Sequence, residues 1–341
     1  MKRGFTDWRK YKCSNPDSCF VFYDMQFVEL GASGLRVSRV GVGTAVFGLE
    51  HYGIPTPGEE AVGAAKAMAT IRAAADGGVN FFDTAPGYGA GEEILGEALA
   101  RYPDCILATK IPVPDGLALM PAQEVARKVN ASLDNSRRAL RREVLDVVQI
   151  HNATKMVLGS DPFMDSLERA RDDGKVRWLG ASVYGAGTAL AAIRTGKIQV
   201  LQLAVSLLDQ QMCHHALPEA ERMGVGVLTR SALLKGALTM RARWLPESLR
   251  PVAEASARVV AALKTSWDEL PTIAMRFCLS LRAAQTVLVG IRSAAELQEC
   301  LKAEAAGPLP PNLLDIAHSL AMNDEQFVNP SFWRLDEGDT K

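Results

Sequence analysis

Short apolar runs alternate with longer amphipathic segments along most of the chain, beginning near residue 40. Brief runs rich in β-branched residues are typical of buried strands, and apolar positions repeated every three or four residues are typical of helices. We expect strands at 40–43, 80–83, 105–110, 145–151, 176–181, 200–203, 226–229 and 286–289. Between them we expect helices at 64–75, 91–101, 121–142, 162–173, 187–194, 216–223, 251–266 and 270–281. The chain is therefore predicted to repeat a strand–helix unit eight times.

Several of these strands are apolar at almost every position, as in 145–150 and 286–289. Strands that are buried on both faces are characteristic of a parallel sheet covered by helices. Eight of them within about 250 residues predict an α/β fold of the (β/α)8 TIM barrel type. A doubly wound open sheet is the alternative, but no G-x-G-x-x-G motif follows the first strand.

Three segments lie outside the eightfold repeat. Residues 27–38 contain two short apolar runs around a Gly-containing turn, which predicts a β-hairpin that could close the lower end of the barrel. After residue 308 we expect one further helix and an aromatic tail. Residues 1–24 are expected to be a loose extension, and residues 25–341 a single barrel domain.

Composition narrows the function classes. The chain has 341 residues, with 38 Lys and Arg against 39 Asp and Glu. A net charge of -1 gives no basic surface for nucleic acid, and no apolar run approaches the roughly 20 residues that cross a bilayer. The six cysteines are scattered, and Cys13 and Cys19 lack the partner spacing of a metal site. We expect a cytoplasmic protein with a small-molecule partner, no bound metal, and no nucleic-acid or membrane partner.

Four polar residues stand at predicted strand ends or in the loop that follows. Asp83 ends the second strand, Tyr88 lies five residues later, and Lys110 and His151 end the third and fourth strands. Each one alone is compatible with a structural role, such as a turn cap or a core histidine. The carboxyl ends of barrel strands meet at one mouth, however, so together the four predict a single site.

The chemistry of such a site follows from the four side chains. A phenol has a reference pKa of about 10, and a nearby ammonium favours its deprotonated form. Burying the Lys110 ammonium requires a carboxylate, and Asp83 is the available partner. A neutral His151 could then donate a hydrogen bond to a substrate oxygen while Tyr88 gives or takes a proton. This set suits an oxygen that alternates between carbonyl and alcohol.

These motifs make the chain similar to the aldo-keto reductases, from about Leu30 to about Leu301. They are 78–89 (GVNFFDTAPGYG), 93–99 (EILGEAL), 108–110 (ATK), 146–151 (DVVQIH), 174–182 (GKVRWLGAS) and 289–291 (VGI). The resemblance implies a (β/α)8 barrel, NADPH bound across its mouth with NADH as the alternative cofactor, and the catalytic tetrad Asp83, Tyr88, Lys110 and His151.

The resemblance also implies a set of cofactor-binding residues. They are Ser182, Gln202, Arg230, Ser231, Ile291, Arg292, Ser293, Glu296 and Glu299. In the family the first two positions hold the nicotinamide carboxamide, and an aromatic residue normally stands where this chain has Arg230. A guanidinium plane can also stack on a ring. Structural roles remain open for Ser182 as a helix cap, for Gln202 as a buried polar group and for Ser293 as the cap of a helix.

The substrate pocket is expected above Tyr88, with walls from Phe47, His51, Tyr52, Asn152 and Phe332. Within the family the chain looks most like bacterial members related to plant L-galactose dehydrogenase and aldose dehydrogenases, through 225–231 (VGVLTRS). That favours a sugar or another polyhydroxylated carbonyl compound.

Two other functions stay open. One is a non-catalytic, cofactor-binding regulatory subunit on the same barrel. The other is an aldolase in which Lys110 forms a Schiff base. For the cofactor, Arg292 favours the 2′-phosphate of NADPH and Glu296 opposes it, which predicts NADPH use with small discrimination against NADH.

Overall fold

The structure is a computed structural model that describes residues 23–49 and 52–335. Eight parallel strands form a closed barrel in the order β10-β3-β4-β5-β6-β7-β8-β9. The strands are β3 (Val40–Gly43), β4 (Phe81–Asp83), β5 (Ile106–Ile111), β6 (Leu145–Ala153), β7 (Val176–Val183), β8 (Val200–Ala204), β9 (Gly226–Arg230) and β10 (Thr286–Val289). The predicted (β/α)8 barrel is confirmed.

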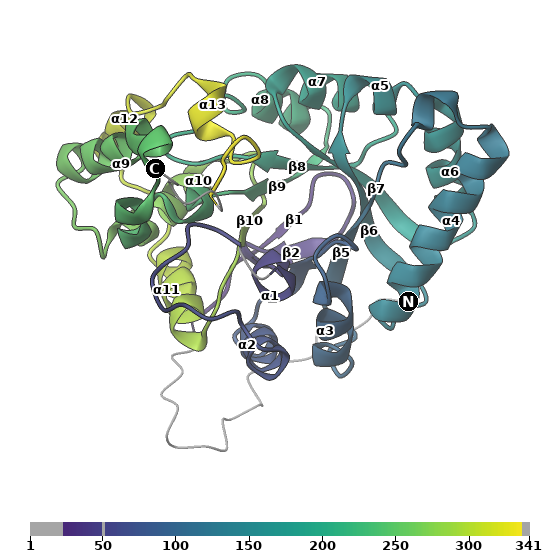
Figure 1. The fold of residues 1–341 in the computed structure, drawn as a ribbon, viewed down its shortest axis with the longest axis horizontal. Coiled ribbons are helices and arrows are strands. Elements are labelled where there is room, and N and C mark those ends of the chain that lie inside the picture. Colours follow the sequence, from purple (N-terminus) through teal and green to yellow (C-terminus); the bar gives the residue numbers. More distant parts are fainter. Residues whose placement is uncertain (1–22, 50–51, 336–341) are drawn as a thin grey trace.

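Helices surround this barrel as an outer ring (Figure 1). The long ones are α2 (Ala64–Asp76), α3 (Gly91–Ala98), α4 (Ala122–Ala139), α6 (Asp161–Asp172), α7 (Ala186–Arg194), α8 (Ala216–Arg222), α9 (Arg250–Ala262), α10 (Leu270–Ser280) and α11 (Ala294–Ala305). Short helical turns join them: α1 (Ala45–Gly48), α5 (Lys155–Leu158), and the 3-10 turns η2 (Leu117–Leu119), η3 (Leu234–Gly236), η4 (Met240–Trp244) and η5 (Glu247–Leu249). Within the described residues, no helix is both long enough and apolar enough to cross a membrane.

The predicted hairpin is also present, as β1 (Phe27–Glu29) paired antiparallel with β2 (Arg36–Ser38). Leu30 and Val37 from this hairpin are fully buried in one cluster with Phe81, Val147 and Leu228 from the barrel strands. Apolar side chains from the hairpin thus cover the interior of the barrel at the end where the strands begin. This leaves the carboxyl ends of the strands as the open mouth.

The C-terminal segment supplies two further helices, α12 (Pro311–His318) and α13 (Glu325–Val328), on the α9 side of the barrel (Figure 1). Backbone hydrogen bonds tie it to the loop after β8, because the amide of Met322 donates to the carbonyl of Leu208 at 2.8 Å. Lys235, in the loop after β9, donates to the carbonyl of Pro330 at 3.3 Å. The tail is therefore anchored beside the mouth. Cys13, Cys19 and nearly all of the expected extension 1–24 lie outside the described residues.

Candidate functional site

Two strand ends bring a buried ion pair to the centre of the mouth. The Nζ of Lys110 on β5 lies 2.5 Å from Oδ2 of Asp83 on β4, and the two side chains are only 1% and 6% exposed. Burial alone would lower the pKa of the Lys110 ammonium, but Asp83 outweighs it and the pKa is raised above its usual value. Lys110 also donates to the carbonyl of Thr84 at 2.8 Å. The ammonium is held charged, as expected from the sequence.

The second oxygen of Asp83 is held by two amides. Its Oδ1 accepts from Nε2 of Gln149 at 2.7 Å and from Nε2 of Gln202 at 2.9 Å. The Oε1 of Gln202 in turn accepts from the hydroxyl of Ser182 at 3.4 Å. A carboxylate with this many donors is fixed in position. Gln202 therefore holds a tetrad residue and Ser182 contacts Gln202, in addition to the cofactor role that the resemblance implies for both.

Tyr88 is placed over the ion pair by the loop after β4. The Lys110 Nζ lies 4.9 Å from the centroid of the Tyr88 ring, and the His151 ring meets that ring edge-on at 5.9 Å between centroids. The loop is pressed closely against α1, since a Cβ at Gly48 would lie 1.6 Å from the carbonyl oxygen of Tyr88. Only glycine fits there, which explains this residue at the end of α1. The structure thus brings all four predicted catalytic residues together.

The His151 imidazole is neutral near pH 7. Burial lowers its pKa to about 4, assisted by the positive charges of Lys110 and Arg230, while Asp83 acts in the opposite direction. A neutral imidazole carries one N–H, so it can donate a hydrogen bond to a substrate oxygen without competing with Tyr88 as the proton source.

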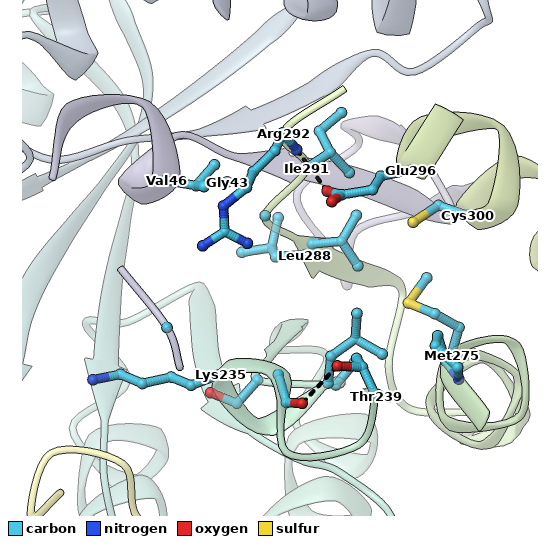
Figure 2. Close-up of a pocket in the computed structure, with 18 of the residues that line it drawn as sticks. Gly43, Val46, Lys235, Thr239, Met275, Leu288, Ile291, Arg292, Glu296 and Cys300 are labelled. Carbon is cyan, nitrogen blue, oxygen red and sulfur yellow. Dashed lines mark hydrogen bonds between the residues drawn. The ribbon is translucent and has the colours of Figure 1, made fainter. Parts of the chain in front are cut away.

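A cavity of about 490 Å³ extends from the tetrad across the mouth to the start of α11. Asp83, Tyr88 and Gln202 line one part of it, and residues of the loops after β9 and β10 line the rest. Figure 2 shows Lys235 and Thr239 on one side of the cavity and Arg292, Glu296 and Cys300 on the other. The cofactor residues expected from the sequence that line it are Gln202, Arg230, Ser231, Ile291, Arg292, Glu296 and Glu299. Ser182 and Ser293 are not among the residues of its wall.

Arg230, the last residue of β9, is poorly satisfied by its neighbours. Its guanidinium lies over the ring of Tyr184 at 4.2 Å, and its Nη1 donates to the hydroxyl of Ser231 at 3.3 Å. Its Nη2 is buried and has no hydrogen-bond partner among the described residues. A buried donor without an acceptor is unfavourable, and Arg230 itself lines the cavity.

The start of α11 is built as a capped helix terminus. The hydroxyl of Ser293 accepts from the amide of Glu296 at 3.2 Å, and Glu296 accepts from the amide of Arg292 at 2.7 Å. Ser293 thus has the capping role that the sequence left open. Arg292 reaches the carbonyl of Tyr52 with Nη2 at 2.5 Å, so the segment after α1 lies beside this helix.

Glu59 joins the loops after β3, β9 and β10. Its carboxylate contacts both terminal nitrogens of Arg241 at 2.5 Å and the Nε of Arg292 at 3.3 Å. The hydrogen bonds from Arg241 lower the pKa of Glu59 to about 2, although burial acts against them. Backbone bonds reinforce the contact, because Ile54 donates to the carbonyl of Lys235 at 3.0 Å. The segment 52–62 thus crosses to the β9 loop beside the cavity.

The candidate substrate residues are spread more widely. Tyr52 lines the cavity, and burial raises the pKa of its phenol to about 12. Phe47 is buried in the core, Asn152 is an exposed residue of β6, and Phe332 is 57% exposed in the tail. His51 lies outside the described residues. Of the four of these residues that the structure describes, only Tyr52 lies in the cavity wall.

Four functional candidates were not predicted from the sequence: Gln149, Lys235, Arg241 and Glu59. Gln149 is the only polar residue between Val147 and Ile150, and a buried amide inside an apolar strand is itself a signal. Lys235 and Arg241 belong to the loop after the seventh barrel strand, where barrels of this type often bind phosphate. Glu59 has no local signal, because its partner Arg241 is 182 residues away.

This donor set fits a phosphorylated dinucleotide. Lys235, Arg241 and Arg292 all line the same cavity and give it positive charge, which favours phosphate, although Glu59 already pairs with both arginines. At the other end, Arg230, Asp83 and Tyr88 line the same cavity. No group of three or more His, Cys, Asp and Glu side chains in the described part of the chain is placed to hold a metal ion.

Comparisons with known proteins agree with this geometry. The chain is 28% identical over 292 residues to L-galactose dehydrogenase of Arabidopsis thaliana, covering 79% of this chain and 85% of that protein. It is 26% identical over 318 residues to pyridoxal 4-dehydrogenase of Microbacterium luteolum, covering 79% and 90%. The holo form of aldo-keto reductase AKR11C1 from Bacillus halodurans has the same fold, with a TM-score of 0.74, 24% identity, and coverage of 89% of this chain and 99% of that one.

The model of the Aldo/keto reductase family matches residues 39–320, which include every barrel strand and all four tetrad residues. The family supports an NAD(P)-dependent oxidoreductase that acts on a small molecule. The chain belongs to the aldo/keto reductase family.

Proposed function

We propose that the protein is an NADPH-dependent oxidoreductase that interconverts a carbonyl compound and its alcohol, with Tyr88 as general acid and base. The observation that carries this proposal is the buried Lys110–Asp83 pair, with Nζ and Oδ2 separated by 2.5 Å, directly beneath the Tyr88 ring. A charged ammonium beside the phenol stabilises the negative charge that develops on the phenol oxygen during proton transfer, which a proton donor requires.

Each tetrad residue has a distinct task in reduction. When bound, the reduced nicotinamide supplies a hydride to the carbonyl carbon. His151 donates a hydrogen bond to the carbonyl oxygen, and Tyr88 transfers its proton to that oxygen as negative charge develops there. Lys110 stabilises the phenolate left on Tyr88, which then regains a proton from solvent. Asp83 keeps Lys110 charged and in place, and alcohol oxidation runs the same steps in reverse.

The cofactor is held along the cavity between β9 and α11. Lys235, Arg241 and Arg292 would supply positive charge for its phosphates, and Glu299 lies in the wall in the middle of α11. Ser231 and Ile291 contribute neighbouring backbone and side-chain contacts. We propose that NADPH is preferred and NADH also accepted, because the acidic groups Glu59 and Glu296 offset part of the positive charge that would favour a 2′-phosphate.

For the substrate we propose a sugar or another polyhydroxylated carbonyl compound. The support is the similarity over most of the chain to L-galactose dehydrogenase of Arabidopsis thaliana. We propose that the reaction interconverts a CH–OH group of this compound and the matching C=O group. We also propose a cytoplasmic location, supported by the free thiols of Cys105, Cys213, Cys278 and Cys300.

A regulatory subunit is the second candidate function. The chain is 28% identical over 332 residues to a probable voltage-gated potassium channel subunit beta of Arabidopsis thaliana. The tetrad of this chain favours turnover, since its four side chains contact one another in sequence and two of them, Asp83 and Tyr88, line the cavity. The Schiff-base aldolase is less favoured, because its lysine must be a neutral nucleophile and Asp83 raises the pKa of Lys110.

A substrate panel tests the proposal. Purified protein is mixed with NADPH or NADH and with aldehydes, ketones and sugars, and consumption of reduced cofactor is followed by its absorbance. The matched alcohols are tested with the oxidised cofactors. We expect turnover of at least one carbonyl–alcohol pair, with NADPH more effective than NADH. Tight cofactor binding without turnover across the panel would favour the regulatory subunit instead.

A further inference from the structure

Arg230 brings a positive charge to the end of the cavity that Asp83, Tyr88 and Gln202 line, which we call the catalytic end. It is the last residue of β9, and β9 pairs with β8 so that Leu228 faces Gln202. Arg230 is two residues beyond Leu228, which is roughly 6.6 Å along the strand. It therefore lies nearer the carboxyl end of the strands than Gln202, whose amide binds Asp83. Its charge acts on the His151 imidazole and on the Tyr52 phenol. Arg230 and Tyr88 line the same cavity.

The other charges at this end balance. Lys110 and Asp83 form an ion pair, and the His151 imidazole is neutral near pH 7 because its pKa is lowered to about 4. Arg230 forms no ion pair within 4.0 Å with a described carboxylate. Asp209 acts on it only from farther away. The catalytic end therefore carries about one uncompensated positive charge, mostly on a guanidinium whose Nη2 is buried without a partner.

We propose that Arg230 makes the protein bind the reduced nicotinamide cofactor more tightly than the oxidised one. This inference rests on the proposed function. The hydride donor must stand within about 3.5 Å of the carbon whose oxygen receives the Tyr88 proton, so the nicotinamide ring occupies the catalytic end. That ring is neutral when reduced and cationic when oxidised. The guanidinium repels only the oxidised form.

The remaining cations of the cavity do not produce this difference. Arg241 and Arg292 contact Glu59 in the part toward α11 and would meet groups that are identical in both cofactor forms, and the ammonium of Lys235 donates to the carbonyl of Pro330 in the tail. Their effect cancels in the ratio of the two dissociation constants. An aromatic residue at position 230 would stack on either ring form without repelling the oxidised one. The ratio of the two dissociation constants thus depends on the charge of Arg230.

The expected size of the effect is at least tenfold. A charge pair separated by several Å in a partly buried site changes binding by this order or more. Tenfold tighter binding of the reduced form raises the midpoint potential of the bound two-electron couple by about 30 mV. The equilibrium of the reaction between protein-bound reactants shifts toward the carbonyl compound and the reduced cofactor. The oxidised cofactor also dissociates more readily after each reduction.

Equilibrium binding tests the inference without turnover. Dissociation constants of NADPH, NADP⁺ and adenosine 2′,5′-bisphosphate are measured by calorimetry for the wild type, Arg230→Gln and Arg230→Lys. We expect the ratio of the NADP⁺ constant to the NADPH constant to fall about tenfold in Arg230→Gln and to stay within threefold in Arg230→Lys. The bisphosphate lacks the nicotinamide, so its constant should change less than twofold in either variant.

Three results would overturn the inference. The first is an unchanged ratio in Arg230→Gln, and the second is an equal loss of affinity for both cofactor forms, which would mean stacking alone. The third needs no variant, since a wild-type ratio of one or less excludes the effect even if both variants fail to fold. If neither nicotinamide cofactor binds the wild type, the proposed function fails with it, whereas binding of both with an insensitive ratio leaves that function intact.

Discussion

The Nζ of Lys110 lies 2.5 Å from Oδ2 of Asp83, and neither side chain is appreciably exposed. Removing one member of a buried pair leaves an uncompensated charge, which typically costs about 3–5 kcal/mol. Because Asp83 also accepts from Gln149 and Gln202, its loss affects three donors at once. The pair is therefore both a structural and a functional element of the barrel mouth.

The first prediction concerns Asp83→Asn. We expect a loss of about 3–5 kcal/mol in the free energy of unfolding and a shift of the high-pH limb of activity to lower pH. The reason is that burial, no longer opposed by Asp83, lowers the pKa of Lys110. Denaturant unfolding and the pH dependence of kcat measure the two effects.

A matched control is Asp146→Asn. Asp146 is also a mostly buried carboxylate on a barrel strand, paired with Arg177 at 2.9 Å, but it is not part of the cavity wall. That variant should lose stability and keep the wild-type pH profile. An unshifted profile in Asp83→Asn as well would show that the Asp83 carboxylate serves folding alone.

The second prediction is that His151 does not titrate between pH 5 and pH 8. Burial lowers its folded-state pKa to about 4 from 6.5, so the unfolded chain binds a proton that the folded protein does not. The stability contribution is complete above pH 6.5 and is lost as pH falls toward about 4. NMR titration of the imidazole signals, with His151→Gln for assignment, measures the pKa directly. A midpoint near 6.5 would contradict the lowered pKa of His151.

The third prediction concerns Glu59. Its carboxylate neutralises Arg241 and Arg292 beside the cavity, so Glu59→Gln should strengthen NADPH binding severalfold and NADH binding less. Glu60→Gln is the matched control, because this neighbouring exposed residue has the same charge. Both variants are titrated with both cofactors by fluorescence. Equal gains in the two variants would indicate a general charge effect in place of a specific one.

The fourth prediction concerns the start of α11. Arg292→Ala should weaken NADPH binding more than NADH binding, because the guanidinium can meet the 2′-phosphate. Glu296→Gln keeps a hydrogen-bond acceptor for the amide of Arg292 and removes a negative charge, so it should strengthen NADPH binding selectively. Equal changes for the two cofactors in both variants would mean that neither side chain distinguishes them.

The barrel itself could be predicted from the sequence because burial on both faces leaves a strong local pattern. The strands begin and end within two residues of the expected positions. β6 and β7 each continue two residues past their expected ends, and β6 reaches Ala153 after an irregularity in its pairing with β7. Asn152 has a positive φ of 53° there, and no local sequence pattern predicts that the strand continues past such a residue.

The site was predictable where chemistry depends on strand ends and not where it depends on distant loops. Asp83, Lys110 and His151 follow from the rule that a barrel carries its function at the carboxyl ends of strands. The contact of Glu59 with Arg241 spans 182 residues, so only the folded chain brings the two together. The resemblance implies a cofactor contact for Gln202, and the structure adds a contact that the sequence did not predict, from its amide nitrogen to Asp83.

The fifth prediction tests the central claim, that Tyr88 transfers the proton. Tyr88→Phe keeps the ring that packs against His151 and removes only the hydroxyl. With a substrate found in the panel, we expect kcat to fall by about 10²- to 10⁴-fold, while NADPH affinity changes less than twofold. Single-turnover oxidation of bound NADPH in wild type and Tyr88→Phe gives the rate of the chemical step directly. A variant that retains more than half of the wild-type single-turnover rate would contradict the account.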